Sequence, residues 1–203
     1  MSKNSEGSLN LKFLGDALDH WKGSLFESLQ AARILQGFAV DPMASDLRSW
    51  TPRDFEIFAR LLRIDPAQVI RHQATLVERA KYFDEISHRG DLFLDPDTGV
   101  ATGRVKNAGC YVRAAELGRL LDAFPERLLA VYQHVRGKPV ADRIDDVASA
   151  VRKEAGNFSW CSYESSTVGM IFLSRTASRT GQVAEHFQSL LALHATGRIR
   201  LKS

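Results

Sequence analysis

The sequence predicts an α/β fold in which a mostly parallel sheet is covered by helices on both faces. Short apolar runs at 38–40, 92–94 and 128–132 alternate with longer segments of helical periodicity, which is typical of parallel strands joined by crossover helices. Two more apolar runs, 158–163 and 168–173, are separated by a short polar link and predict a C-terminal antiparallel hairpin. We therefore expect three layers, with a sheet that is parallel first and antiparallel last.

The length and composition predict one well-packed domain. The chain has 203 residues, of which 44% are hydrophobic and 25% charged, as in ordinary globular proteins. We expect a disordered, polar N-terminus over 1–10 and a single domain over 11–203. The net charge of +3 is compatible with a polyanionic partner but does not identify one.

The sequence also predicts a cytoplasmic protein with no membrane association. It opens without the apolar core of a secretory signal, and no apolar run approaches the roughly 20 residues that span a bilayer. Cys110 and Cys161 lie far apart without metal-type spacing, so both are expected to be free thiols. The oligomeric state stays open.

The helices are predicted from their apolar spacing and their caps. Thr51 is expected to cap a helix whose first position is Pro52, and the same cap-then-proline signal starts a second helix over about 65–86. This pair would form a helical insertion at about 51–88. The connection 98–110 is expected to be a glycine-bearing loop, and the basic C-terminal residues a tail. The other helices are expected at about 15–34, 114–124, 140–155 and 178–195.

Two carboxylates, Asp95 and Asp97, directly follow the apolar run 92–94. In an open α/β sheet, ligands bind just beyond the carboxyl ends of the strands, which is where these side chains would lie. Paired carboxylates suit a hard divalent cation or the transfer of a proton. The alternative is an Asx-type turn, in which the aspartates bond to their own backbone.

Two more polar clusters favour a shared site. The run 128–132 ends in Gln133, His134 and Arg136, so a second strand would carry polar side chains at its end. Near the N-terminus, Asp16, Asp19 and Lys22 repeat every three residues and share one helix face. The alternative for this last cluster is a solvated face with an Asp19–Lys22 pair.

Three motifs together resemble a group of uncharacterised bacterial and phage proteins. They are Gly-Asp-x-x-Asp-x-x-Lys at 15–22, Phe-Leu-Asp-Pro-Asp-x-Gly at 93–99 and Tyr-Gln-His at 132–134. The resemblance implies an α/β fold with these residues at one site, and it implies no particular reaction.

The carboxyl half of the chain, about 90–175, is similar in architecture to class I methyltransferases. This likeness implies a Rossmann-like sheet with an Asp-Pro strand end beside a bound S-adenosylmethionine. The chain departs from those enzymes after its first strand, where Asp41-Pro42-Met43 replaces the usual Gly-x-Gly turn.

We assign expected roles to the clustered side chains. The candidate ligands for Mg²⁺ or Mn²⁺ are Asp16, Asp19 and Asp95. The candidate catalytic groups are Lys22, Asp97 and His134. The candidate substrate-binding residues are Arg104, Gln133, Arg136, Tyr163 and Glu164.

The function expected from these roles is a metal-dependent nuclease or phosphoesterase that acts on a nucleic acid or a nucleotide. A metal held by the carboxylates would polarise the phosphate and activate water. Two alternatives stay open. The chain could be an S-adenosylmethionine-dependent, methyltransferase-like protein, or it could be a non-catalytic binding protein on the same fold.

Overall fold

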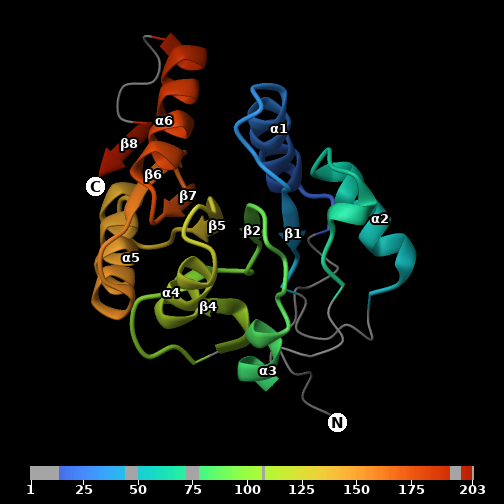
Figure 1. The fold of residues 1–203 in the computed structure, drawn as a ribbon, viewed down its shortest axis with the longest axis horizontal. Helices are drawn as coiled ribbons and strands as arrows, with labels where there is room; N and C mark the ends of the chain where they lie inside the picture. Colours follow the sequence, from blue (N-terminus) through green and yellow to red (C-terminus); the bar gives the residue numbers. More distant parts are fainter. Residues whose placement is uncertain (1–13, 44–49, 72–77, 107, 193–197, 203) are drawn as a thin grey trace.

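Figure 1 shows a sheet with helices on both of its faces in the computed structural model. The structure describes residues 14–43, 50–71, 78–106, 108–192 and 198–202. The predicted disordered segment 1–10 lies outside these ranges. The predicted α/β class is confirmed: the main sheet is mixed and six-stranded, with the order β1-β2-β5-β7-β6-β8.

The first three strands in this order are parallel, and the strands beyond them alternate in direction. The parallel strands are β1 (Ala39–Asp41), β2 (Leu92–Leu94) and β5 (Leu129–His134). The antiparallel part consists of β7 (Val168–Ser174), β6 (Ser159–Glu164) and β8 (Ile199–Lys202). Thus β7 lies between β5 and β6 and runs opposite to both.

Alternate residues of each central strand enter two separate cores. In β2, Phe93 packs on one side of the sheet while Leu92 and Leu94 pack on the other, and all three are fully buried. This two-sided burial explains why the strand is a continuous apolar run rather than an alternating one. The Phe93 side is covered by α1 (Ala17–Ala31), α2 (Pro52–Leu61) and α6 (Ala177–Leu191). The other side is covered by α3 (Arg79–Asp84), α4 (Ala114–Ala123) and α5 (Val140–Ala155).

The start of α2 is as predicted. Thr51 caps the helix through a reciprocal capping box with Asp54, and Pro52 occupies the first position. The second helix of the predicted insertion is wrong in its first part. Only a 3₁₀ turn forms at Pro66–Gln68, and Val69 then pairs with β1 through a parallel bridge to Val40. The β-branched residues after the turn favour this extended backbone over a helix.

Two strands were missed in the expected loop 98–110 and just after it. The pair β3 (Gly99–Ala101) and β4 (Tyr111–Arg113) forms a small parallel sheet, with a 3₁₀ turn at Ala108–Cys110 before β4. The expected basic tail is also a strand, β8, which pairs with β6 at the sheet edge. Strands of three or four residues give too short a pattern to be recognised from periodicity.

Candidate functional site

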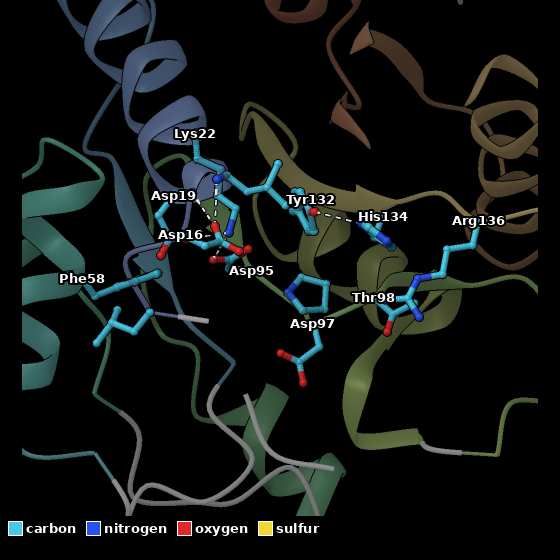
Figure 2. Close-up of a pocket in the computed structure, with 13 residues that line it drawn as sticks. Asp16, Asp19, Lys22, Phe58, Asp95, Asp97, Thr98, Tyr132, His134 and Arg136 are labelled. Carbon is cyan, nitrogen blue, oxygen red and sulfur yellow. Dashed lines mark hydrogen bonds and ion pairs between the residues drawn. The ribbon is translucent and has the colours of Figure 1, made fainter. Parts of the chain in front are cut away.

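A cavity of about 380 Å³ lies where the carboxyl ends of β2 and β5 meet the first turn of α1. Figure 2 shows the charged side chains of its wall gathered from these three elements. The cavity is lined by Leu14, Asp16, Leu18, Asp19, Lys22, Phe58, Asp95, Pro96, Asp97, Thr98, Tyr132, His134 and Arg136. All three predicted polar clusters therefore contribute to one site.

At the start of α1, two aspartates satisfy backbone amides. The Asp16 carboxylate accepts hydrogen bonds from the amides of Leu18 (2.8 Å) and Asp19 (3.2 Å), as an N-cap residue does. The Asp19 carboxylate accepts another from the amide of Gly15, at 2.9 Å. The two aspartates therefore stabilise the start of α1 and also form part of the cavity wall.

Lys22 lies between two carboxylates that come from different elements. Its Nζ is 2.8 Å from Asp95 Oδ2 and 3.1 Å from Asp19 Oδ1, and it lies 4.6 Å from the centre of the Tyr132 ring. Burial alone would lower the pKa of Lys22, but Asp95 and Asp19 outweigh it and raise that pKa above its ordinary value. Lys22 is therefore a fixed ammonium group and not a proton acceptor near neutral pH.

The carboxylates at the end of β2 titrate closer to neutrality than ordinary aspartates. Burial raises the pKa of Asp95 to about 6, against the opposing effect of Lys22. Burial also raises the pKa of Asp97 to about 6, although a hydrogen bond with Cys110 and the charge of Lys22 lower it. Asp97 is only partly buried, so it can exchange a proton with a bound molecule.

The end of β5 supplies the opposite wall. The Tyr132 hydroxyl lies 3.3 Å from His134 Nδ1, and Arg136 is exposed at the rim. Figure 2 marks the contact between Tyr132 and His134 with a dashed line. Burial and the neighbouring Arg136 lower the pKa of His134, so its imidazole is uncharged near neutral pH. A neutral imidazole can accept a proton, which keeps His134 a candidate general base.

Gln133, predicted to bind substrate, does not line the cavity. It is fully buried, and its side-chain amide bonds to the backbone of residues 98–100. Gln133 Oε1 accepts from Val100 N (2.9 Å), and Gln133 Nε2 donates to Thr98 O (3.0 Å). A Cβ on Gly99 would lie 2.5 Å from this amide, and the φ of Gly99 is +119°. Glycine is therefore required at this position, and Gln133 attaches β3 to β5.

The other predicted substrate-binding residues, apart from Arg136, also lie away from this cavity. Tyr163 packs on the rings of Trp21 and Phe187, with centroids 6.0 and 5.0 Å apart. Glu164 is buried and accepts hydrogen bonds from Ser162 Oγ and from Arg200. Arg104 lies in an adjoining groove that shares part of the cavity rim.

Two of the three predicted metal ligands contact an ammonium group. Asp19 and Asp95 both contact Lys22, while Asp16 caps a helix. Across the described ranges, no group of three or more His, Cys, Asp or Glu side chains has a geometry that could hold a metal ion. A divalent cation at Asp19 and Asp95 would have to displace Lys22, so Mg²⁺ or Mn²⁺ stays a hypothesis from the sequence.

The sequence did not identify the apolar part of the cavity wall. Phe58 and Leu18 lie in segments that were predicted only to be helices, and Leu14 lies just before the helix that contains Leu18. Tyr132 was noted only within the Tyr-Gln-His motif. Its position two residues before His134 on a strand could have indicated it, because alternate strand residues point to one face.

Comparisons with known proteins leave the site to be interpreted from its own chemistry. No protein-family model matches the chain, and no curated protein sequence matches it. Among the residues that the structure describes, no helix combines the length and apolar character needed to cross a membrane.

Proposed function

We propose that the protein is a methyltransferase-like enzyme that binds a nucleoside-type cofactor, S-adenosylmethionine, in the cavity at the ends of β2 and β5. The observation that carries this proposal is the combination of carboxylates with apolar and aromatic walls in one cavity. S-adenosylmethionine is a nucleoside with a sulfonium and an ammonium group, and it supplies an electrophilic methyl group when bound. The rest of the argument concerns the residues of this chain.

The sheet supports the proposal by analogy. The carboxyl half of class I methyltransferases ends in an antiparallel hairpin, and here the antiparallel strands β7 and β6 follow β5, with β8 added beyond β6. On this proposal the sheet and its two helical layers are Rossmann-like, and β6 and β7 are the predicted C-terminal hairpin. A fold admits many functions, so this likeness only directs attention to the cavity.

The chemistry of the cavity fits the cofactor. The carboxylates of Asp16 and Asp97 can accept hydrogen bonds from ribose hydroxyls or an ammonium group, and they favour a positively charged ligand. Leu18, Phe58 and Tyr132 provide apolar surface for a base. A cavity of about 380 Å³ is in the range of small-molecule sites.

Two groups at the rim could remove the proton of a methyl acceptor. Asp97 has a pKa raised to about 6 by burial, and His134 is held neutral near pH 7 by a lowered pKa. Both are therefore able to take up a proton in the neutral range. The hydroxyl of Tyr132 contacts His134 and can orient its ring.

The Lys22 ion pairs favour this reading over a metal-dependent hydrolase. A hydrolase with the predicted ligands would need Asp19 and Asp95 as metal ligands, but in this structure both carboxylates contact Lys22. Nucleoside binding instead leaves this buried group in place, because it uses the carboxylates and apolar surface at the cavity opening.

Isothermal titration calorimetry can test the proposal. We expect S-adenosylmethionine and S-adenosylhomocysteine to bind with Kd below about 100 μM, and Phe58→Ala and Asp97→Asn to weaken binding by about 10-fold or more. Asp122→Asn, an exposed aspartate outside the cavity, is the matched control.

The same titrations can overturn the proposal. Failure of both ligands to bind at about 1 mM would do so. Binding of Mg²⁺ or Mn²⁺ that Asp95→Asn abolishes, with no binding of S-adenosylmethionine, would support the metal-dependent phosphoesterase instead.

A further inference from the structure

A second hollow adjoins the carboxylate cavity and has the opposite charge. This basic groove, of about 430 Å³, shares Thr98, His134 and Arg136 with the cavity. It is lined by Thr98, Thr102, Gly103, Arg104, Val105, Tyr111, His134, Arg136, Lys138 and Arg143. Four of these side chains are cationic, and none of the described lining residues is acidic.

The cations of the basic groove differ in how they are held. Arg143 is fixed, because its guanidinium donates to Thr102 Oγ1 and to Val100 O, each at 2.6 Å. Lys138 forms an exposed ion pair with Asp146. Arg104 and Arg136 are both exposed, and within the described part of the chain neither forms an ion pair with a carboxylate. The groove therefore presents positive charge that its own surroundings do not neutralise.

The positive charge continues beyond the basic groove. A third hollow, of about 550 Å³, shares Thr102, Gly103, Arg104 and Val105 with the groove. It adds Arg113 and Lys153, with Glu154 as its only acidic residue among those described. The two basic hollows thus form a continuous track that starts at the rim of the carboxylate cavity. A track longer than one site suits a polymer better than a single anion.

We propose that this basic track binds the phosphodiester backbone of single-stranded nucleic acid. The strand would pass the shared rim at Thr98, His134 and Arg136, where a nucleotide would meet the contents of the cavity. Single strands suit this geometry because an unpaired base can turn toward a pocket without the energy of leaving a duplex.

This inference rests on the proposed function, whose substrate class it names. The cavity and the track carry opposite charges, which suit the two different ligands. The carboxylate cavity favours a cationic cofactor, and the basic track favours a polyanionic substrate. Arg and Lys side chains bind phosphates without reading sequence, so little sequence preference is expected from the track itself.

Fluorescence anisotropy with labelled single-stranded DNA and RNA tests the track. The variant Arg104→Gln/Lys138→Gln/Lys153→Gln removes three cations of the track and none of the carboxylate cavity. The matched control, Arg53→Gln/Arg60→Gln/Arg119→Gln, removes three exposed cations that line neither the cavity nor the track. Both variants change the net charge equally.

We expect the track variant to bind a strand about 10-fold or more weakly, and the control to bind like wild type. The slope of log affinity against log salt should fall by up to about 2 in the track variant, because each lost phosphate contact to a single strand removes about 0.7. The two labelled probes show whether DNA or RNA binds more tightly.

Three results would overturn the inference. They are no binding of either strand by wild type at about 50 mM salt, an equal loss of affinity in the control, or equal affinity for inorganic polyphosphate. Titration of S-adenosylmethionine into the track variant separates this inference from the proposed function. The track variant should bind S-adenosylmethionine as tightly as wild type does. If wild type binds the single strand but not S-adenosylmethionine, the proposed function is refuted and the inference about the track is not.

Discussion

Lys22 Nζ lies 2.8 Å from Asp95 Oδ2, so an ion pair joins the second turn of α1 to the end of β2 across 73 positions of the chain. Both side chains are at most 8% exposed. A buried ion pair is costly to desolvate, but removing one partner is costlier, because it leaves the other charge buried and uncompensated.

Replacing Lys22 should therefore destabilise the fold. We expect Lys22→Met to lower the free energy of unfolding by about 3 kcal/mol or more, since Asp19 and Asp95 would repel each other in a buried place. Urea unfolding followed by circular dichroism measures this change. Lys81→Met, which removes a lysine with a 59% exposed side chain, should change stability by less than about 1 kcal/mol. Similar losses in the two variants would contradict the prediction.

Asp95 should make stability depend on pH in the acidic range. Burial raises its folded pKa to about 6, above the value of 3.8 for a free aspartate, so the folded state holds the proton more tightly. Its contribution to stability is therefore present at low pH and is lost as pH rises through about 6.

Between pH 7 and 5, we expect Asp95 to contribute about 1 kcal/mol of added stability as the pH falls. Asp95→Asn should remove that contribution, and Asp84→Asn, on the exposed end of α3, should keep it. Chemical denaturation at a series of pH values gives the two slopes. A slope in Asp95→Asn equal to that of wild type would show that Asp95 does not contribute to the pH dependence.

Gly99 should not tolerate a side chain. In Gly99→Ala the new Cβ would lie 2.5 Å from the Gln133 amide, and the backbone has φ of +119°, which alanine rarely adopts. We expect a loss of about 2 kcal/mol or more in thermal or urea unfolding. Gly103→Ala is the control, because nothing lies within 4 Å of its Cβ position. Equal stability of the two variants would mean that β3 shifts to make room.

Asp91 should be important for the fold rather than the site. It is 2% exposed and lies at the amino end of β2, where its carboxylate accepts from Gln36 N (2.7 Å), Leu128 N (2.8 Å) and Arg179 (2.5 Å). Asp91→Ala should destabilise by about 3 kcal/mol or more, while leaving ligand affinity per folded molecule unchanged.

Asp122→Ala is the control for Asp91→Ala, since the Asp122 side chain is 66% exposed in its pair with Arg175. It should lose less than about 1 kcal/mol of stability. Differential scanning calorimetry and ligand titration on the same samples measure both properties. A fall in affinity of folded Asp91→Ala would place Asp91 in the site.

The sequence could predict that the polar residues after β2 and β5 lie close together, because this follows from a general property of parallel sheets. Asp95 and His134 each follow a strand, and the ends of neighbouring parallel strands meet at one edge. Asp16 and Lys22 were placed on one helix face by their spacing. The sequence could not reveal that Lys22 reaches Asp95, because helix spacing predicts only the local partner Asp19.

Two other differences between the prediction and the structure also arise from contacts between segments that are distant in the sequence. Gln133 was predicted to bind substrate, but its side-chain amide forms hydrogen bonds with the backbone at the start of β3. This contact depends on how two segments pack. Arg143 lies in the helix expected over 140–155, and it becomes part of the basic groove because its guanidinium donates to the backbone of β3 at Val100. Chain patterns indicate which face of an element is polar, but not which neighbour it meets.

The strand β8 has a consequence for the solubility of the protein. It pairs with β6 from Trp160 to Tyr163, and its Arg200 and Lys202 form ion pairs with Asp145. Without β8, the six-residue strand β6 would present unpaired backbone groups along the sheet edge, a template on which another copy could add a strand. By covering the edge of β6, this short charged strand reduces the risk of edge-to-edge aggregation.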